Sequence, residues 1–231
     1  MTFDCGDLGI GSGGHGHADA LSLTLFSGGR ELLIDPGTCI YNAAPAWRRF
    51  FRSTAAHNAV VVDGNGQCEP ADTFRWKTKA AGRANQLVLL PEIECVDGMV
   101  DLPNGCAHRR RLIYVRPEYW IVADEITGTG THNFDFLYHF APDVQMNILS
   151  DESRGDIDCS ASIDDAVLQL QLYGSAAIRA EALCGQTDPI QGWASRSYGE
   201  RRPCPVLKAS ARGSAPLAML SFMIPIWPAL S

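Results

Sequence analysis

Short apolar runs that alternate with polar residues, each closed by a turn signal, constrain this chain's fold more than any other feature. In the run 18–26, three leucines take alternate positions and a serine and a threonine lie between them. Because successive side chains of a strand point to opposite faces, this pattern predicts a half-buried β-strand. A Ser-Gly-Gly turn at 27–29 then predicts a hairpin, with residues 30–35 as the returning strand.

Comparable runs follow along the rest of the chain at the short spacing that is typical of all-β proteins. They predict strands near 58–63, 73–79, 86–90, 108–115, 119–125, 133–140, 167–173, 176–183 and 217–224. Near the start, only residues 46–52 suggest a short helix. The chain has 231 residues, a size that β-sandwiches reach as one domain. We therefore predict an all-β fold in which residues 1–231 form a single, large antiparallel β-sandwich of two packed sheets with few short helices.

Composition narrows the classes of function. The formal net charge is −7, which argues against a nucleic-acid partner because such proteins carry basic patches. No apolar stretch has the length of a membrane span, and no glycine-rich phosphate loop is present. The eight cysteines are scattered without a Cys-x-x-Cys pair, a pattern that favours free thiols. Residues 1–5 lack the features of a signal peptide, so the compartment stays open, and the abrupt glycine-rich start suggests a C-terminal piece of a longer protein.

Candidate metal ligands gather in the first quarter of the chain. On a strand, positions two apart face the same side, so His15 and His17 are expected to approach one point. Asp35 ends the predicted hairpin and His57 begins the next predicted strand. Zinc binds imidazole nitrogen and carboxylate oxygen, and the spacing predicts a site of His17, Asp35 and His57 with His15 nearby. Asp19 is either a competing carboxylate or a residue that orients the imidazole of His17.

Four motifs, in this order and spacing, carry a family resemblance. They are HGHADALS at 15–22, LIDPG at 33–37, RSTAAHN at 52–58 and VDG at 62–64. Together they resemble the C-terminal domain of the heparinase II/III family of polysaccharide lyases. Weaker similarity to that family continues downstream at 108–110, Asp124, His132, 138–140 and 192–199.

The resemblance implies a β-sandwich that follows an N-terminal toroid of α-helical hairpins, which this chain does not contain. It also implies a bound zinc ion with His17, Asp35 and His57 as ligands. His15 would then point to the cleft between the two domains and assist catalysis, which modifies the expectation from spacing alone. The zinc ion would mainly hold strand ends and loops in place.

The resemblance further implies a substrate and a reaction. Family members cleave acidic polysaccharides such as heparan sulfate or alginate by β-elimination, outside the cytoplasm or in the periplasm. A base removes the proton at C5 of a uronate whose carboxylate is neutralised, and His15 is a candidate for neutralisation or proton handling. Arg52 and Tyr41 are candidates for substrate contact, with Arg48 and Arg49 as further cations. Because the main catalytic pair belongs to the toroid, we expect the isolated chain to have little or no activity.

Two other functions stay open from the sequence. The first is a non-catalytic carbohydrate-binding or structural module that uses the same sandwich and the same zinc as a scaffold. The second is a small zinc hydrolase that activates a metal-bound water with His15 as the base. The sequence leaves the identity of the polysaccharide undetermined.

Overall fold

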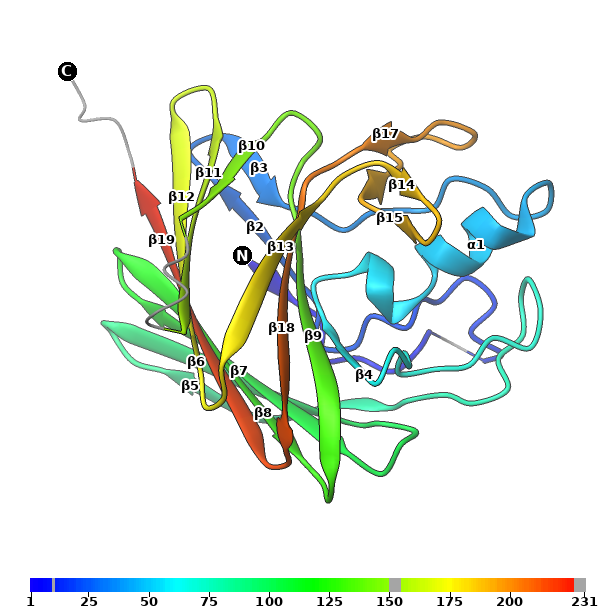
Figure 1. Ribbon diagram of the computed structural model, residues 1–231, viewed down its shortest axis with the longest axis horizontal. Helices are drawn as coiled ribbons and strands as arrows, with labels where there is room; N and C mark the ends of the chain where they lie inside the picture. The colour runs from blue at the N-terminus through cyan, green and yellow to red at the C-terminus, as the bar shows by residue number, and fades with distance from the viewer. Residues whose placement is uncertain (10, 150–154, 227–231) are drawn as a thin grey trace.

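The chain folds into antiparallel β-sheets that pack face to face (Figure 1). The computed structural model describes residues 1–9, 11–149 and 155–226. The larger sheet has eight strands. In spatial order these are β10 (Gln145–Ile148), β11 (Asp156–Ile163), β12 (Ala166–Gly174), β19 (Leu217–Ile226), β8 (Tyr119–Thr127), β7 (Ala107–Val115), β6 (Ile93–Asp101) and β5 (Gly82–Leu89).

The opposing layer is a four-stranded sheet that continues into a three-stranded one. The four strands are β13 (Ile178–Leu183), β18 (Val206–Ser214), β9 (Thr131–His139) and β4 (Val60–Val62). The three are β1 (Thr2–Phe3), β2 (Leu23–Ser27) and β3 (Arg30–Leu33). An isolated bridge between Leu33 and Phe140 joins the end of β3 to the residue after β9. This join places the predicted hairpin beside β9, which ends at His139.

Short elements gather at one side of the sandwich, on the right in Figure 1. They are α1 (Pro45–Phe51), the 3₁₀ turn η1 (Thr54–Ala56) and the paired strands β14 (Gln186–Thr187), β15 (Ile190–Gln191), β16 (Trp193–Ala194) and β17 (Arg202–Pro203). Trp47 of α1 packs edge-on against Trp193, with ring centroids 5.2 Å apart. Among the described residues, no helix is long and apolar enough to cross a membrane.

Alternate residues of the facing strands fill the space between the layers. Val122 and Ile126 of β8 and Met219 of β19 project inward from the large sheet, and Phe134 and Phe136 of β9 oppose them. All five side chains are buried in one apolar cluster. The prediction of an all-β sandwich of two packed sheets is therefore confirmed, because period-2 alternation leaves one apolar face on each sheet. All eight cysteines carry free thiols.

The hairpin turn follows from its two glycines. Ser27 pairs with Arg30, so Gly28 and Gly29 are the two central residues of a tight turn. Both have positive φ, 60° and 73°, as two-residue hairpin turns require. The short helix predicted at 46–52 is present as α1, with Pro45 in its first turn, where the missing N–H costs nothing.

One predicted strand is wrong. Residues 73–79 form turns and an isolated bridge rather than a strand. The physical reason is local, since the Asp72 carboxylate accepts hydrogen bonds from the backbone N–H groups of Phe74 and Arg75 at 2.9 and 2.8 Å. Such a side-chain bond replaces the ladder bonds of a strand. Arg52 also donates to the Thr73 carbonyl at 2.7 Å and holds the segment in place.

Four strands of the eight- and four-stranded sheets lie where the sequence predicted none, namely β6, β10, β11 and β18, and the two-residue strands β1 and β14 to β17 were not predicted either. β11 and β18 are rich in serine, alanine or aspartate, and β6 contains two aspartates and a glycine, residues with low strand propensity, while β10 has only four residues. Gly98 of β6 shows why such a residue is needed, because a Cβ there would lie 2.6 Å from a methyl carbon of Leu21. Pairing with neighbouring strands, not local propensity, forms these elements.

A buried ion pair fastens the large sheet to the opposite layer. Arg110 of β7 is fully buried, and its Nε donates to an Asp124 carboxylate oxygen of β8 at 2.7 Å. Its Nη1 donates to the carbonyls of Leu21 and Asn58 at 2.7 and 2.6 Å. Although burial alone would raise the pKa of Asp124, the charge of Arg110 and the hydrogen bond from His108 lower it to about 2. The carboxylate is thus ionised and fully partnered.

Truncation of Arg110 tests how much this buried ion pair contributes to stability. We expect Arg110→Ala to lower the free energy of unfolding by about 3–5 kcal/mol, because it leaves a buried carboxylate without its partner. Urea unfolding followed by tryptophan fluorescence measures the change. The matched control is Arg111→Gln, since Arg111 is half-buried on the other face of β7 and should change stability by about 1 kcal/mol or less. Equal effects of the two variants would contradict the role given to Arg110.

A second histidine–aspartate pair, His132 with Asp63, gives a prediction about the pH dependence of stability. His132 of β9 contacts the Asp63 carboxylate through Nδ1 at 2.6 Å and the Thr129 carbonyl through Nε2 at 2.9 Å. The hydrogen bond to Asp63, and to a smaller extent that to the Thr129 carbonyl, raises the pKa of His132 above its usual value. The stabilisation from the pair is therefore fully present below the unfolded-state pKa of about 6.5 and is lost as the pH rises through the folded-state value.

The variant Asp63→Asn tests this prediction, because it removes the charge that acts on His132. NMR titration of the His132 ring should give a midpoint above about 6.5 in the wild type and a lower one in the variant. The difference in urea midpoint between the two proteins should shrink as the pH rises from about 5.5 to about 8.5. A His132 midpoint that does not respond to Asp63→Asn would refute the assignment.

Candidate metal centre

The segment that carries the two nearby histidines is a loop, which corrects the strand expected from residue 18 onward. Strand β2 begins only at Leu23, and Leu21 has a positive φ of 65°. The Ala18 N–H is bonded instead to the Arg52 carbonyl at 2.9 Å. Without strand periodicity, His15 and His17 do not face one point, and the loop directs them to two different places.

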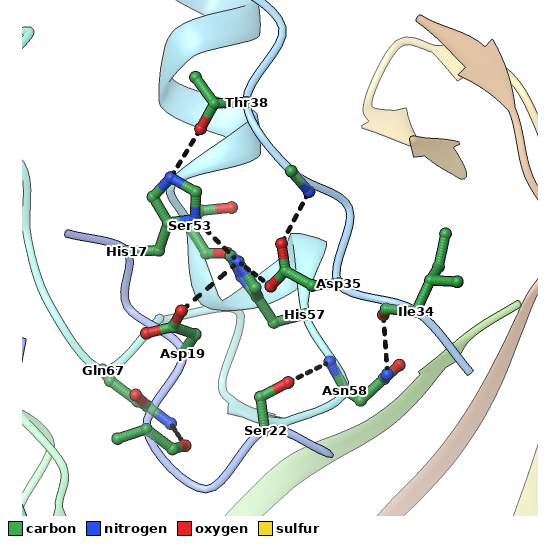
Figure 2. A network of polar contacts seen from close by, with 12 residues as sticks. His17, Asp19, Ser22, Ile34, Asp35, Thr38, Ser53, His57, Asn58 and Gln67 are labelled. Carbon is green, nitrogen blue, oxygen red and sulfur yellow. Dashed lines mark hydrogen bonds and ion pairs between the residues drawn. The ribbon is translucent and has the colours of Figure 1, made fainter. Parts of the chain in front are cut away.

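His17 lies in a cluster with Asp19, Asp35 and His57 (Figure 2). One potential ligand atom from each residue lies within 4.8 Å of the others. The His57 Nε2 atom is 3.2 Å from His17 Nδ1, 3.5 Å from an Asp35 oxygen and 3.9 Å from an Asp19 oxygen. The three predicted ligands are thus brought together, and Asp19 joins them through its carboxylate.

Hydrogen bonds outside the cluster fix which ring nitrogens face inward. His57 Nδ1 lies 2.8 Å from the Ser53 carbonyl, which only accepts, so this nitrogen carries a proton and Nε2 faces the cluster. The Thr38 hydroxyl lies 2.8 Å from His17 Nε2, which leaves His17 Nδ1 facing His57. Partners of this kind orient the histidine ligands of metals.

Asp35 is aimed by the turn that follows β3. The Gly37 N–H donates to one Asp35 carboxylate oxygen at 2.8 Å, and the other oxygen faces His57 at 3.5 Å. Gly37 has a positive φ of 74°, which its lack of a side chain permits. The Asp-Pro-Gly signal in the sequence therefore orients a ligand as well as ending the strand.

Asn58, next to His57, connects the segments that supply the cluster. Its side-chain Nδ2 donates to the carbonyls of Leu23 and Ile34 at 2.7 and 3.0 Å. Its side-chain oxygen accepts from the His139 N–H. The sequence motif contained Asn58, but we assigned it no role, because only the fold shows that β2, β3 and β9 end around it.

The electrostatics favour a bound cation. Burial, followed by the charges of His57, Arg48 and Arg52, lowers the pKa of His17 to about 3, so the imidazole is neutral. Burial raises the pKa of Asp19 to about 6, which shows that its charge lacks compensation. Neutral imidazole is the form that coordinates metals, and a cation would stabilise the carboxylates.

The donor set fits zinc. Two imidazoles and carboxylate oxygens are zinc ligands, and bonds of about 2.0–2.2 Å place tetrahedral donors roughly 3.4 Å apart. The separations of 3.2 and 3.5 Å around His57 Nε2 match this spacing.

His15 belongs to a neighbouring exposed patch of aromatic rings. Its ring lies 5.6 Å from Tyr41 and 6.2 Å from Phe74, measured between centroids. Tyr41 is also stacked between Phe74 and Tyr198, at 5.9 and 6.0 Å. We call these four residues the aromatic row. His15, Phe74 and Tyr198 are exposed, so the row offers ring faces and one imidazole to a ligand.

Arg52 is buried, whereas a side chain that contacts the substrate directly would be exposed. Its side chain is 1% exposed, stacks on the Trp76 ring at 3.9 Å and donates to the carbonyls of Asp72 and Thr73. Tyr41, in contrast, is half-buried beside His15. Of the two predicted substrate contacts, only Tyr41 thus belongs to the patch that contains His15.

The family model described as heparinase II/III-like, C-terminal, matches residues 1–216. The chain belongs to this family. A comparison with curated proteins gives no significant match.

Solved structures show the same fold. One is a heparan sulfate lyase, HepC, from Pedobacter heparinus, with a TM-score of 0.74 and 18% identity over 94% of this chain and 32% of that one. Another is a heparinase III, with a TM-score of 0.73 and 15% identity over 93% of this chain and 31% of that one. This heparinase II/III-like domain therefore spans about a third of the length of those chains.

Proposed function

We propose that this chain is the zinc-binding C-terminal domain of an enzyme that cleaves uronic-acid-containing polysaccharides by β-elimination. Family membership supports the lyase class, and the similar solved structures include a heparan sulfate lyase. The observation that carries the proposal is the convergence of His17, Asp35 and His57 beside the aromatic row that contains His15.

Zinc in this proposal is a structural ion. His17, Asp35 and His57 are its ligands, and the carboxylate of Asp19 is close enough to complete a tetrahedral set. The ion would join the loop 13–22, the turn after β3 and the segment before β4, and would neutralise the carboxylates of Asp19 and Asp35. Four protein donors leave no open coordination position, which argues against the zinc hydrolase that the sequence left open.

His15 is the group that this domain contributes to the reaction. In β-elimination, a base takes the C5 proton of the uronate, the C4–O bond breaks, a C4–C5 double bond forms and the departing sugar oxygen receives a proton. The exposed imidazole of His15 is suited to neutralise the uronate carboxylate or to handle a proton. Tyr41, stacked between Phe74 and Tyr198, contacts the sugar.

The second wall of the cleft belongs to a helical domain in this proposal. The chain spans about a third of the similar lyase chains, and the sequence resemblance assigns the remaining catalytic groups to an N-terminal toroid. The isolated chain therefore has little or no activity. The partners are this helical domain and an acidic polysaccharide.

One observation favours a second candidate, a non-catalytic carbohydrate-binding module. The Tyr198 side chain of the aromatic row is 65% exposed and that of Phe74 is 38% exposed, and sugar rings stack on such faces. Glycan binding without turnover, with the helical domain present, would support this candidate over the lyase.

Metal analysis tests the zinc site. We expect about one zinc per purified chain, and we expect His57→Ala to lose both the ion and much of the folding stability, because structural zinc contributes directly to folding. The control is His132→Gln, which removes a histidine that lies outside the cluster and should keep its zinc. A folded wild-type chain without zinc, unchanged when zinc is added, would refute the site.

Lyase assays test the reaction. Heparan sulfate, heparin and alginate are offered to the chain alone and to the chain supplied with its helical domain, and unsaturated uronate is followed by ultraviolet absorbance. We expect turnover only in the second case, with a loss of about 100-fold or more in His15→Ala, as for a proton-transfer group. His132→Gln should keep full activity. Robust turnover by the chain alone would contradict the assignment.

A further inference from the structure

Two buried arginines lack an acidic partner. Arg48 and Arg52 lie one turn apart at the end of α1 and are 2% and 1% exposed. The acidic residues of the adjacent segment are engaged elsewhere, since Asp72 pairs with Arg75 and Glu69 with Lys77. Within the described ranges, neither arginine forms an ion pair, although buried charges in proteins are normally paired.

The hydrogen bonds of the two guanidinium groups are also incomplete. Arg52 donates through Nη1 to the carbonyls of Asp72 and Thr73, and Arg48 donates through Nη2 to the Gly14 carbonyl at 3.1 Å. Arg52 Nε and Nη2 and Arg48 Nη1 are buried without any partner. Carbonyls satisfy part of the donor capacity. Asp72 lies near enough for its charge to act on Arg52, but its carboxylate is paired with Arg75, and among the described residues no carboxylate is within ion-pair distance of Arg48 or Arg52.

A cavity lies against these side chains. It has a volume of about 160 Å³ and is lined by Pro45, Arg48, Arg49, Arg52 and residues 70–73. A water molecule occupies about 30 Å³, so the space admits a sulfate or carboxylate group together with some water. Arg49 is exposed and adds a third cation. A larger cavity of about 660 Å³, lined by Arg49, Arg52 and Trp76 among others, lies on the same part of the surface.

Three arginines and one carboxylate, that of Asp72, line the cavity, so its lining carries a net positive charge that favours an anion. Burial and the neighbouring charge of Arg48 lower the pKa of Arg52 to about 10, which reflects the cost of two adjacent buried cations. Guanidinium groups bind sulfate and carboxylate oxygens through paired hydrogen bonds. An anion in the cavity would supply the missing charge and acceptors.

We propose that this cavity binds a sulfate or carboxylate group of the acidic polysaccharide, as a subsite beside the one at His15. The two sites are connected, because the Arg48 guanidinium carbon lies 4.7 Å from the centroid of the Tyr41 ring in the aromatic row. The glycan source of the anion rests on the proposed function, whereas the anion chemistry rests on the arginines alone.

Calorimetric titration of the full chain tests this site. The probes are sodium sulfate at constant ionic strength maintained with chloride, a sulfated heparin oligosaccharide, and an unsulfated uronate oligosaccharide. We expect saturable binding of sulfate and of at least one oligosaccharide, and competition between them. Arg49→Gln, which removes an exposed cation without opening the core, should weaken both affinities by about fivefold to tenfold through the loss of a charge-assisted contact.

The matched control is Arg179→Gln, which removes one exposed arginine from β13 and should leave both affinities unchanged. Three outcomes would overturn the proposal. They are a lack of saturable sulfate binding, an equal loss of affinity in both variants, and an oligosaccharide affinity that Arg49→Gln does not change. Zinc content is measured on the same samples. A chain without zinc that still binds sulfate through Arg49 would refute the metal site and support the anion site, so the two failures are distinguishable.

Discussion

The fully buried guanidinium of Arg110 is the contact on which the rest of the structure depends. It pairs with Asp124 within the large sheet and donates to the carbonyls of Leu21 and Asn58 across the core. Asn58 in turn bonds the first residue of β2, Leu23, and the residue that follows β3, Ile34. One cation thereby fixes the distance between the large sheet and the segments that present His17, Asp35 and His57.

Charge imbalance explains why two regions of this domain are candidates for binding. The metal cluster places two carboxylates beside two imidazoles, of which that of His17 is neutral, and burial raises the pKa of Asp19, so the cluster favours a cation. Arg48 and Arg52 are buried, and within the described residues neither pairs with a carboxylate, so their cavity favours an anion. Tyr41 of the aromatic row contacts both His15 and Arg48. A surface that is held in place by zinc and binds an acidic sugar is consistent with both the metal cluster and the arginine cavity.

Local signals predicted those parts of the fold that local chemistry controls. Alternation predicted the sandwich, two glycines predicted the hairpin turn, and the short helix α1 was placed correctly. Prediction failed where distant residues compete with local preference. Asp72 and Arg52 convert the apparent strand at 73–79 into turns, and β18, with its small and polar residues, is a strand because β9 and β13 pair with it on both sides.

The sequence by itself determined the fold class and the residues of the cluster, because strand periodicity and ligand chemistry are properties of short segments. Spacing alone placed His15 and His17 at one point, whereas the family resemblance implied two places, and the structure has them in two places. Only the tertiary structure decided that the Asp19 carboxylate joins the cluster and that Arg52 is buried under Trp76. These outcomes depend on which segments meet in space. Burial and pairing of charges are set by those long-range contacts, and residue type alone does not specify them.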